Sequence, residues 1–205
     1  MLNTLILGTA NRNKGRELTT LLAPSGLRLY TLADVAGPLA IDEPGQSLAE
    51  NARLKASRQA EHLGTWVLGD DTGLLVDALD GAPGVHTARY AGPNATAEAN
   101  RRRLLAELAG VPPEQRTACF VCHLALADPS GAIRAVSEGF CRGRILFEPA
   151  GDTAFGYDCL FQIVEYHRTL AELGPTAQAY LTHRARAVRR LLPQIAGLLE
   201  SASGF

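Results

Sequence analysis

An apolar run followed at once by two neighbouring carboxylates is the feature that most restricts how this chain can fold. The run 65–68 is typical of a buried β-strand, and Asp70 and Asp71 come directly after it, where the pattern changes to glycine and threonine. Adjacent carboxylates repel each other unless a cation, a proton or solvent separates their charges. Two interpretations are open: a turn in which the aspartates bond nearby amides, or a metal site at the end of a strand.

Apolar strands alternate with polar turns and helices, which indicates an α/β protein with a mixed β-sheet flanked by helices. The first strand runs into a polar turn and an amphipathic helix that ends before Pro24. Ser47 and Glu50 form a capping box for a second helix that stops at Gly64. Later segments predict a helix, a hairpin, a Phe-Gly-Tyr-Asp loop and a terminal helix, over residues 96–109, 117–140, 155–158 and 176–199. No linker composition divides the chain, so we expect a single domain over residues 1–205.

Composition and charge exclude several classes of protein. The 205 residues carry a formal net charge of −1, which argues against the basic footprint that nucleic acid requires. The sequence has no secretory leader and no apolar span of about 18 residues, so we expect a cytoplasmic protein outside the membrane. Cys119 and Cys122, three apart on a predicted strand, face opposite sides and are interpreted as buried thiols rather than zinc ligands. The run 101–103 of arginines fans out around a helix, which is typical of a solvated surface.

Five segments of the chain occur together in the order typical of one enzyme family. They are TANRNK, ENARLKA, GDDTGLLVDALDGAPGVHTARYAG, FGYD and THR, at residues 9–14, 50–56, 69–92, 155–158 and 182–184. Together they resemble the Ham1/inosine triphosphate pyrophosphatase family. The resemblance implies an elongated mixed α/β sheet with two lobes and a central cleft, and a homodimer. It also implies hydrolysis of non-standard purine nucleoside triphosphates (ITP, dITP and XTP) to the monophosphate and pyrophosphate, with Mg²⁺ as the cofactor.

The resemblance also implies roles for individual residues. Asp71 matches the general base and a metal-bound carboxylate, and Glu43 matches a second acid near magnesium. The triphosphate would lie at the start of the first helix, where N–H groups and the helix dipole favour anions, and Lys55 would reach the same phosphates. The residues implied to contact the substrate are Thr9, Ala10, Asn11, Arg12, Asn13, Lys14, Lys55, Thr72, Phe155, Gly156, Tyr157, Asp158, Gln178, His183 and Arg184. From the residues alone, a plain turn capped by Asn11 or Asn13 and a solvated Lys55 also stay open.

The implied chemistry is consistent with these side chains. A triphosphate needs its negative charge offset before water can approach phosphorus, and Asp71 would orient or deprotonate such a water for attack at the α-phosphorus. Hypoxanthine and xanthine carry a 6-oxo acceptor where adenine carries an amino donor. Phe155 or Tyr157 would stack on the purine, and His183 with Arg184 would supply donors.

The chain departs from the family pattern near the residues expected to receive the base. Gln178 stands where lysine is usual, Ala185 and Ala154 stand in place of glycines, and Cys159 stands in place of a proline. Arg168 is a candidate to replace the missing positive charge. Two alternatives therefore stay open. One is a non-catalytic nucleotide-binding or sensing protein, and the other is a Maf-like pyrophosphatase that acts on other modified triphosphates.

Overall fold

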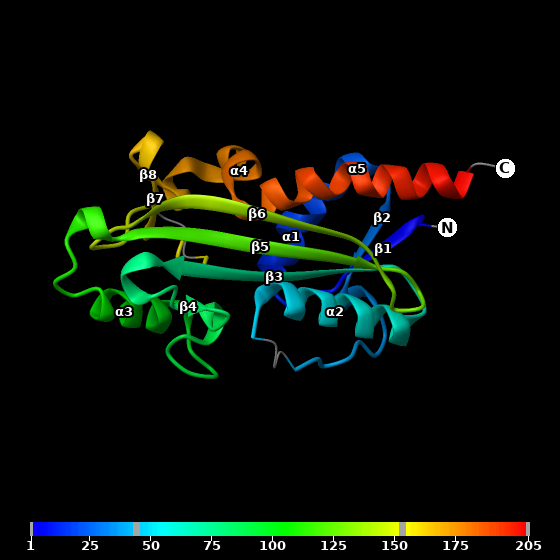
Figure 1. Cartoon of the computed structure of the whole chain (residues 1–205), viewed down its shortest axis with the longest axis horizontal. Coiled ribbons are helices and arrows are strands. Elements are labelled where there is room, and N and C mark those ends of the chain that lie inside the picture. The colour runs from blue at the N-terminus through cyan, green and yellow to red at the C-terminus, as the bar shows by residue number, and fades with distance from the viewer. Residues whose placement is uncertain (1, 43–45, 152–154, 204–205) are drawn as a thin grey trace. The chain divides into compact units, whose positions relative to one another are not determined.

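The computed structural model describes residues 2–42, 46–151 and 155–203 (Figure 1). The strands are β1 (Thr4–Leu7), β2 (Arg28–Thr31), β3 (Val67–Val76), β4 (Pro83–Gly84), β5 (Thr117–Ala127), β6 (Ile133–Ile145), β7 (Phe161–Ile163) and β8 (Arg168–Thr169). The α-helices are α1 (Arg12–Leu22), α2 (Leu48–Leu63), α3 (Ala97–Glu107), α4 (Leu170–Leu181) and α5 (His183–Ser203). Single turns of 3₁₀-helix lie at Ala23–Ser25, Leu32–Asp34, Asp77–Leu79, Thr87–Arg89, Pro113–Gln115 and Val164–Tyr166.

The sheet is mixed. Its strands pair in the order β2-β1-β3-β5-β6-β7-β8, and β4 pairs with β3. Strand β1 runs parallel to β2 and to β3, with Ile6 opposite Val67, whereas β7 runs antiparallel to β6 and to β8. The α/β class with a mixed sheet and flanking helices is therefore confirmed.

The chain divides into two compact units that interleave along the sequence. Unit 1 consists of Met1–Asp71, Cys122–Gly139 and His183–Phe205, and unit 2 of Thr72–Val121 and Phe140–Thr182. Each unit has an apolar core of its own: Leu5, Leu68 and Leu124 are buried in unit 1, and Leu104 and Phe161 are buried in unit 2. The expectation of a single domain stays a prediction.

Two glycines let helices approach strands closely in unit 1. A Cβ placed on Gly69 of β3 would lie 2.2 Å from the carbonyl oxygen of Ala52 on α2. A Cβ on Gly139 of β6 would lie 2.1 Å from the carbonyl oxygen of His183 on α5. Because any larger side chain would push these helices away, glycine at both positions sets the distance from each helix to its strand. Helix α1 in turn packs against α5 (Figure 1).

Helix boundaries largely follow the capping signals in the sequence. Asn11, Ser47 and Thr96 cap α1, α2 and α3 through their side-chain oxygens, and Gly64 ends α2 in the left-handed conformation at φ 62°. The predicted capping box is half present. Ser47 accepts the amide N–H of residue 50, but the Glu50 carboxylate accepts the N–H of Gln46 rather than that of Ser47.

Two boundary predictions are wrong. Asp70 and Asp71 do not follow a strand but lie inside β3, which continues to Val76. The predicted terminal helix over 176–199 is two helices, because Thr182 between α4 and α5 has an extended backbone at ψ 154°. Helix α5 continues through Pro193. None of the helices in the described ranges is both long and apolar enough to cross a membrane.

Candidate active site

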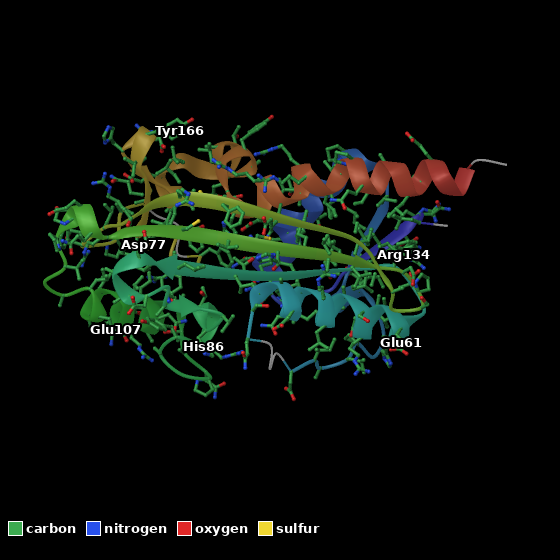
Figure 2. The ribbon with its side chains drawn as sticks, viewed as in Figure 1. Glu61, Asp77, His86, Glu107, Arg134 and Tyr166 are labelled. Carbon is green, nitrogen blue, oxygen red and sulfur yellow. The ribbon has the colours of Figure 1, made fainter. Side chains whose placement is uncertain are left out.

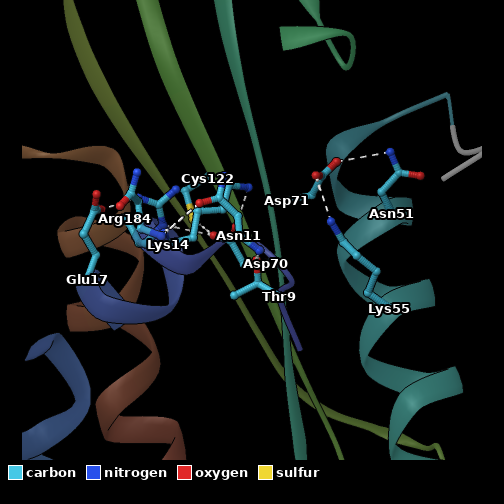
Figure 3. A network of polar contacts seen from close by, with 11 residues as sticks. Thr9, Asn11, Lys14, Glu17, Asn51, Lys55, Asp70, Asp71, Cys122 and Arg184 are labelled. Atoms are coloured by element: carbon cyan, nitrogen blue, oxygen red, sulfur yellow. Dashed lines mark hydrogen bonds and ion pairs between the residues drawn. The ribbon is translucent and has the colours of Figure 1, made fainter. Parts of the chain in front are cut away.

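Asp71 lies on the side of β3 that faces α2, where two side chains from that helix reach its carboxylate (Figure 3). Asn51 donates a hydrogen bond from Nδ2 to Oδ2 over 3.1 Å, and Lys55 pairs through Nζ with Oδ1 over 3.0 Å. Asp71 is only 6% exposed and the Lys55 side chain 13%. Lys55 is therefore a largely buried partner of a carboxylate, and the solvated alternative is wrong.

The spacing of Asn51 and Lys55 explains why both reach Asp71. Residues four apart lie on the same face of a helix, and the close approach at Gly69 brings that face onto β3. Asn51 was missed from the sequence, although its position one turn before Lys55 is a signal that would have found it.

Asp70 lies on the opposite side of β3, in a separate cluster of charges (Figure 3). Lys14 of α1 pairs with Oδ1 over 2.6 Å, and Arg184 of α5 donates from Nε to Oδ2 over 3.2 Å. Arg184 also pairs with Glu17, one turn along α1 from Lys14. The Cys122 thiol lies 3.3 Å from Oδ2 as a further donor. Glu17 and the role of Cys122 were not foreseen, because both depend on contacts between distant parts of the chain.

Burial and the close opposite charges shift the pKa values of the groups in this cluster. Burial disfavours the charged form of Asp70, but the positive charges of Lys14 and Arg184 outweigh that effect and hold the pKa of the carboxyl well below its ordinary value. Burial also opposes the charge of Arg184, yet Asp70 and Glu17 raise the pKa of its guanidinium. Burial and the neighbouring Asp70 raise the pKa of the Cys122 thiol, so the thiol stays protonated and can donate.

The arrangement explains how two adjacent carboxylates coexist. Successive side chains of a strand point to opposite faces, so Asp70 and Asp71 face different helices and each has its own cation. The segment is therefore neither a turn nor a site in which both aspartates bind one metal ion. Of the two aspartates, Asp71 stays a candidate metal ligand, because Asp70 is 1% exposed and bonded to Lys14 and Arg184.

The turn before α1 is capped as one interpretation expected. Asn11 accepts hydrogen bonds from the N–H groups of Asn13 and Lys14, over 3.0 and 3.3 Å, and the Thr9 hydroxyl accepts that of Asn11 over 3.3 Å. Residues 10–13 are exposed. A bound phosphate at this turn, in contact with Ala10 and Arg12 among others, stays a prediction.

The predicted base-contacting residues belong partly to unit 2. Tyr157 is 3% exposed and its hydroxyl donates to the carbonyl of Thr87 over 3.1 Å, so its ring belongs to the core of that unit. Phe155 is half-buried. Gln178 donates from Nε2 to the carbonyl of Leu170 over 2.7 Å, across a break in α4 at Gly174. Stacking of Phe155 or Tyr157 on a purine stays a prediction.

His183 begins α5 in unit 1 and is buried. Burial and the charges of Arg184 and Lys14 hold the pKa of its imidazole well below the ordinary value, although Asp70 acts in the opposite direction. The ring is therefore neutral near pH 7 and carries one donor and one acceptor nitrogen.

Where the structure describes them, the residues at which the chain departs from the family pattern, and two other predicted site residues, differ in how far they are buried. Ala185 and Cys159 are buried, and Arg168 is exposed on β8. Thr72 is half-buried on β3. Glu43 and Ala154 lie outside the described residues.

All four cysteines lie in the described parts of the chain and are free thiols. Cys122, Cys141 and Cys159 are buried, but Cys119 is only partly buried, so the prediction that it is buried is wrong. Within those ranges, His, Cys, Asp and Glu side chains form no group of three or more suited to hold a metal ion.

Known proteins match the sequence of this chain over nearly its whole length. The Ham1 family model matches residues 5–194. The chain is 47% identical over 199 residues to the dITP/XTP pyrophosphatase of Rhodopirellula baltica, which covers 97% of this chain and 96% of that protein. It is 43% identical to the dITP/XTP pyrophosphatase of Desulforamulus reducens, over 92% of this chain and 93% of that protein.

Solved structures agree with the sequence relatives. The fold is similar to that of a HAM1 protein from Coxiella burnetii, with a TM-score of 0.86 and 33% identity over 96% of this chain and 100% of the other. The Staphylococcus aureus Ham1 protein gives a TM-score of 0.84 and 30% identity over 95% and 99% of the two chains. These matches confirm the resemblance of the five sequence segments, and the chain belongs to the Ham1 family.

Proposed function

We propose that this chain hydrolyses non-standard purine nucleoside triphosphates, namely dITP, ITP and XTP, to the monophosphate and pyrophosphate. The observation that carries the proposal is the nearly buried Asp71 carboxylate held by Asn51 and Lys55, in a chain whose relatives are named dITP/XTP pyrophosphatases. The same relatives support hydrolysis of a phosphoric anhydride as the reaction class.

Asp71 is proposed as the general base. Each carboxylate oxygen has two lone pairs, so an oxygen that accepts one bond from Asn51 or Lys55 can accept a second from water. Water attacks the α-phosphorus, its proton passes to Asp71, and the bond from that phosphorus to the bridging oxygen breaks. Pyrophosphate then leaves with the bridging oxygen and the electron pair of the broken bond.

Lysines and the start of α1 are proposed to hold the triphosphate. Lys14 and Lys55 lie beside Asp70 and Asp71 on opposite sides of β3, and each keeps a small exposed fraction through which it would meet phosphate oxygens from its own side. Thr9 and Asn11 lie at the positive end of the α1 dipole, where an anion is stabilised. In this proposal Asp70 holds Lys14 in place and does not contact the substrate.

Mg²⁺ fits the residues around Asp71. Magnesium is usually bound through one or two carboxylates together with substrate phosphates and several waters, rather than by a cage of protein ligands. The Asp71 carboxylate, with lone pairs beyond those that accept from Asn51 and Lys55, suits that mode. Asp71 would hold the ion, with Glu43 as the second acid that the family resemblance implies. When bound, Mg²⁺ would offset phosphate charge and polarise the phosphoryl group.

Base selection is proposed to rest on donors for the 6-oxo group. A site that donates to this oxygen leaves its donors unpaired when adenine, which has an amino group there, is offered instead. The neutral His183 imidazole and the Arg184 guanidinium, which are only 5% and 1% exposed, are proposed as donors to a base that enters against them, and Phe155 as the stacking ring. Gly156, Asp158, Gln178 and Thr72 are proposed as the remaining contacts.

A panel of triphosphates tests the proposal. Purified protein with Mg²⁺ is offered dITP, ITP, XTP, the four standard deoxynucleoside triphosphates and modified pyrimidine triphosphates, and released pyrophosphate and monophosphate are quantified. We expect turnover of the 6-oxo purine substrates dITP, ITP and XTP well above that of dATP. Preferential turnover of pyrimidines would favour the Maf-like alternative, and tight binding without turnover would favour the sensor. The homodimer that the resemblance implies is measured on the same preparation by sedimentation.

A further inference from the structure

Helix α3 in unit 2 carries three successive arginines whose surroundings differ sharply. Arg102 is exposed and pairs with Glu98 one turn earlier on the same helix, over 2.8 Å. Arg103 stacks over the ring of Tyr90 at 4.4 Å and pairs with Glu107, the residue labelled on α3 in Figure 2. Arg101 instead reaches out of the helix and donates from Nη1 to the carbonyl oxygen of Gly156 over 2.8 Å. Arg102 and Arg103 are exposed, as expected of a solvated arginine run, and Arg101 is the exception because its guanidinium bonds a carbonyl.

The acceptor of this bond lies in the middle of the Phe-Gly-Tyr-Asp loop. The N–H of Asp158 donates to the carbonyl of Phe155 over 3.1 Å and closes a turn around Gly156 and Tyr157. Tyr157 anchors one side of this turn, because its ring is buried and its hydroxyl bonds the Thr87 carbonyl. Packing therefore fixes the second half of the loop.

The first half depends on a residue without such an anchor. Gly156 has φ +55°, and a Cβ placed on it would meet no described atom within 4 Å. Glycine populates many backbone conformations, and no crowding selects this one, so packing alone does not orient the Gly156 peptide. Two hydrogen bonds do: the turn bond from Asp158 to Phe155 and the bond from Arg101, which is the stronger kind because its donor is charged.

The charge of Arg101 also acts on Cys159, the residue that follows this loop. Burial raises the pKa of the Cys159 thiol, and the positive charge of Arg101 opposes that rise. The guanidinium thus acts on both Gly156 and the residue that follows Asp158, from a helix that supplies none of the predicted substrate contacts.

We propose that Arg101 is a positioning residue for base recognition: it fixes the Gly156 peptide and thereby holds Phe155 and Asp158 in the orientation that receives a 6-oxo purine. The inference rests on the proposed function. Arg101 itself does not touch the substrate, so its removal weakens binding of the nucleoside part and leaves the phosphate contacts intact.

Steady-state kinetics with dITP compares Arg101→Ala with Arg102→Ala, an exposed arginine at the next position. We expect Arg101→Ala to raise KM about tenfold with kcat changed less than about twofold, the pattern of lost uniform binding. Arg102→Ala should match the wild type. The selectivity for dITP over dATP, as a ratio of kcat/KM values, should fall about tenfold in Arg101→Ala, a loss of about 1.4 kcal/mol.

Product inhibition separates positioning from general damage. In Arg101→Ala, inhibition by the product dIMP should weaken about tenfold while inhibition by pyrophosphate stays unchanged. A variant that is merely misfolded would weaken both. If Arg101→Ala does not fold, Arg101→Lys carries the same measurement. It keeps the charge but loses the planar fork, so we expect an intermediate KM.

Different experimental results would overturn the inference and the proposed function. The inference alone is overturned if the wild type turns over dITP but Arg101→Ala is indistinguishable from Arg102→Ala. It is likewise overturned if Arg101→Ala is weakened equally toward dIMP and pyrophosphate. A wild type that releases no pyrophosphate from dITP overturns the proposed function and the inference with it.

Discussion

Replacement of Asp70 by asparagine tests the charge cluster that joins α1 and α5 to β3. The substitution keeps the shape of the side chain but removes a charge that is 1% exposed, 2.6 Å from Lys14 and 3.2 Å from Arg184. Removal of one partner from a buried ion pair costs roughly 3–5 kcal/mol, because the remaining charge is left uncompensated. Glu17 still neutralises Arg184, so we expect about 3 kcal/mol. At roughly 2–4 °C per kcal/mol for a chain of this size, Tm should fall by roughly 6–12 °C.

Urea unfolding measures the effect. The midpoint for Asp70→Asn should fall while the slope m stays that of the wild type, since the surface exposed on unfolding is unchanged. Glu98→Gln is the matched control, because Glu98 is 72% exposed and pairs with Arg102 at the surface. Such pairs contribute about 1 kcal/mol or less. A loss of less than about 1 kcal/mol for Asp70→Asn would refute the role assigned to this cluster.

Acid provides a second readout of the same prediction. The pKa of Asp70 is lowered in the folded protein, so the unfolded chain takes up the proton first as pH falls. The contribution of this carboxylate to the free energy of unfolding is therefore fully present above the pKa of about 4 that it has in the unfolded chain, and it is lost as pH falls below that value. The difference in unfolding free energy between wild type and Asp70→Asn should be constant from pH 7 to 5 and shrink below pH 4. A difference that does not change with pH would contradict the charge as its source.

Two further substitutions test other parts of the structure. The pKa of buried His183 is lowered, so the unfolded chain binds its proton near pH 6.5 before the folded chain does, and stability should fall from pH 7 to 5. His183→Asn should flatten that slope in urea titrations, and an unchanged slope would contradict a buried neutral ring. Gly69→Ala should destabilise the protein by about 1–3 kcal/mol, because the new methyl group meets the Ala52 carbonyl. The displaced helix moves Lys55 away from Asp71, so dITP turnover should also fall at least about tenfold. The control Gly197→Ala, in open space on α5, should be as stable as wild type or more so, and a Gly69→Ala enzyme with normal turnover would contradict the close approach.

The elements predicted correctly are those whose signals are local. Asn11, Ser47 and Thr96 cap the helices that follow them, and Gly64 ends one, because each acts through backbone groups within a few residues. The hairpin turn is local in the same way, with the N–H of Gly131 bonded to the carbonyl of Asp128.

The errors occur where distant residues decide the structure. Charged side chains in a strand look unfavourable in isolation, and only Lys14, Lys55 and Arg184, supplied by three different helices, make a buried Asp70-Asp71 pair stable. The proximity of Asp71 and Lys55 was expected from family resemblance, whereas the partner of Arg101 lies 55 residues along the chain and left no signal near it.

The most direct test of the central claim is pyrophosphate release from dITP with Mg²⁺ by wild type and Asp71→Asn. The asparagine keeps the side-chain shape and a hydrogen-bonding oxygen but cannot take a proton from water. Loss of a general base lowers turnover by about 10²–10⁴-fold, and we expect a fall of that size while dITP still binds. One pyrophosphate should appear for each dITP that the wild type consumes. Turnover by Asp71→Asn within about tenfold of the wild type would contradict Asp71 as the base.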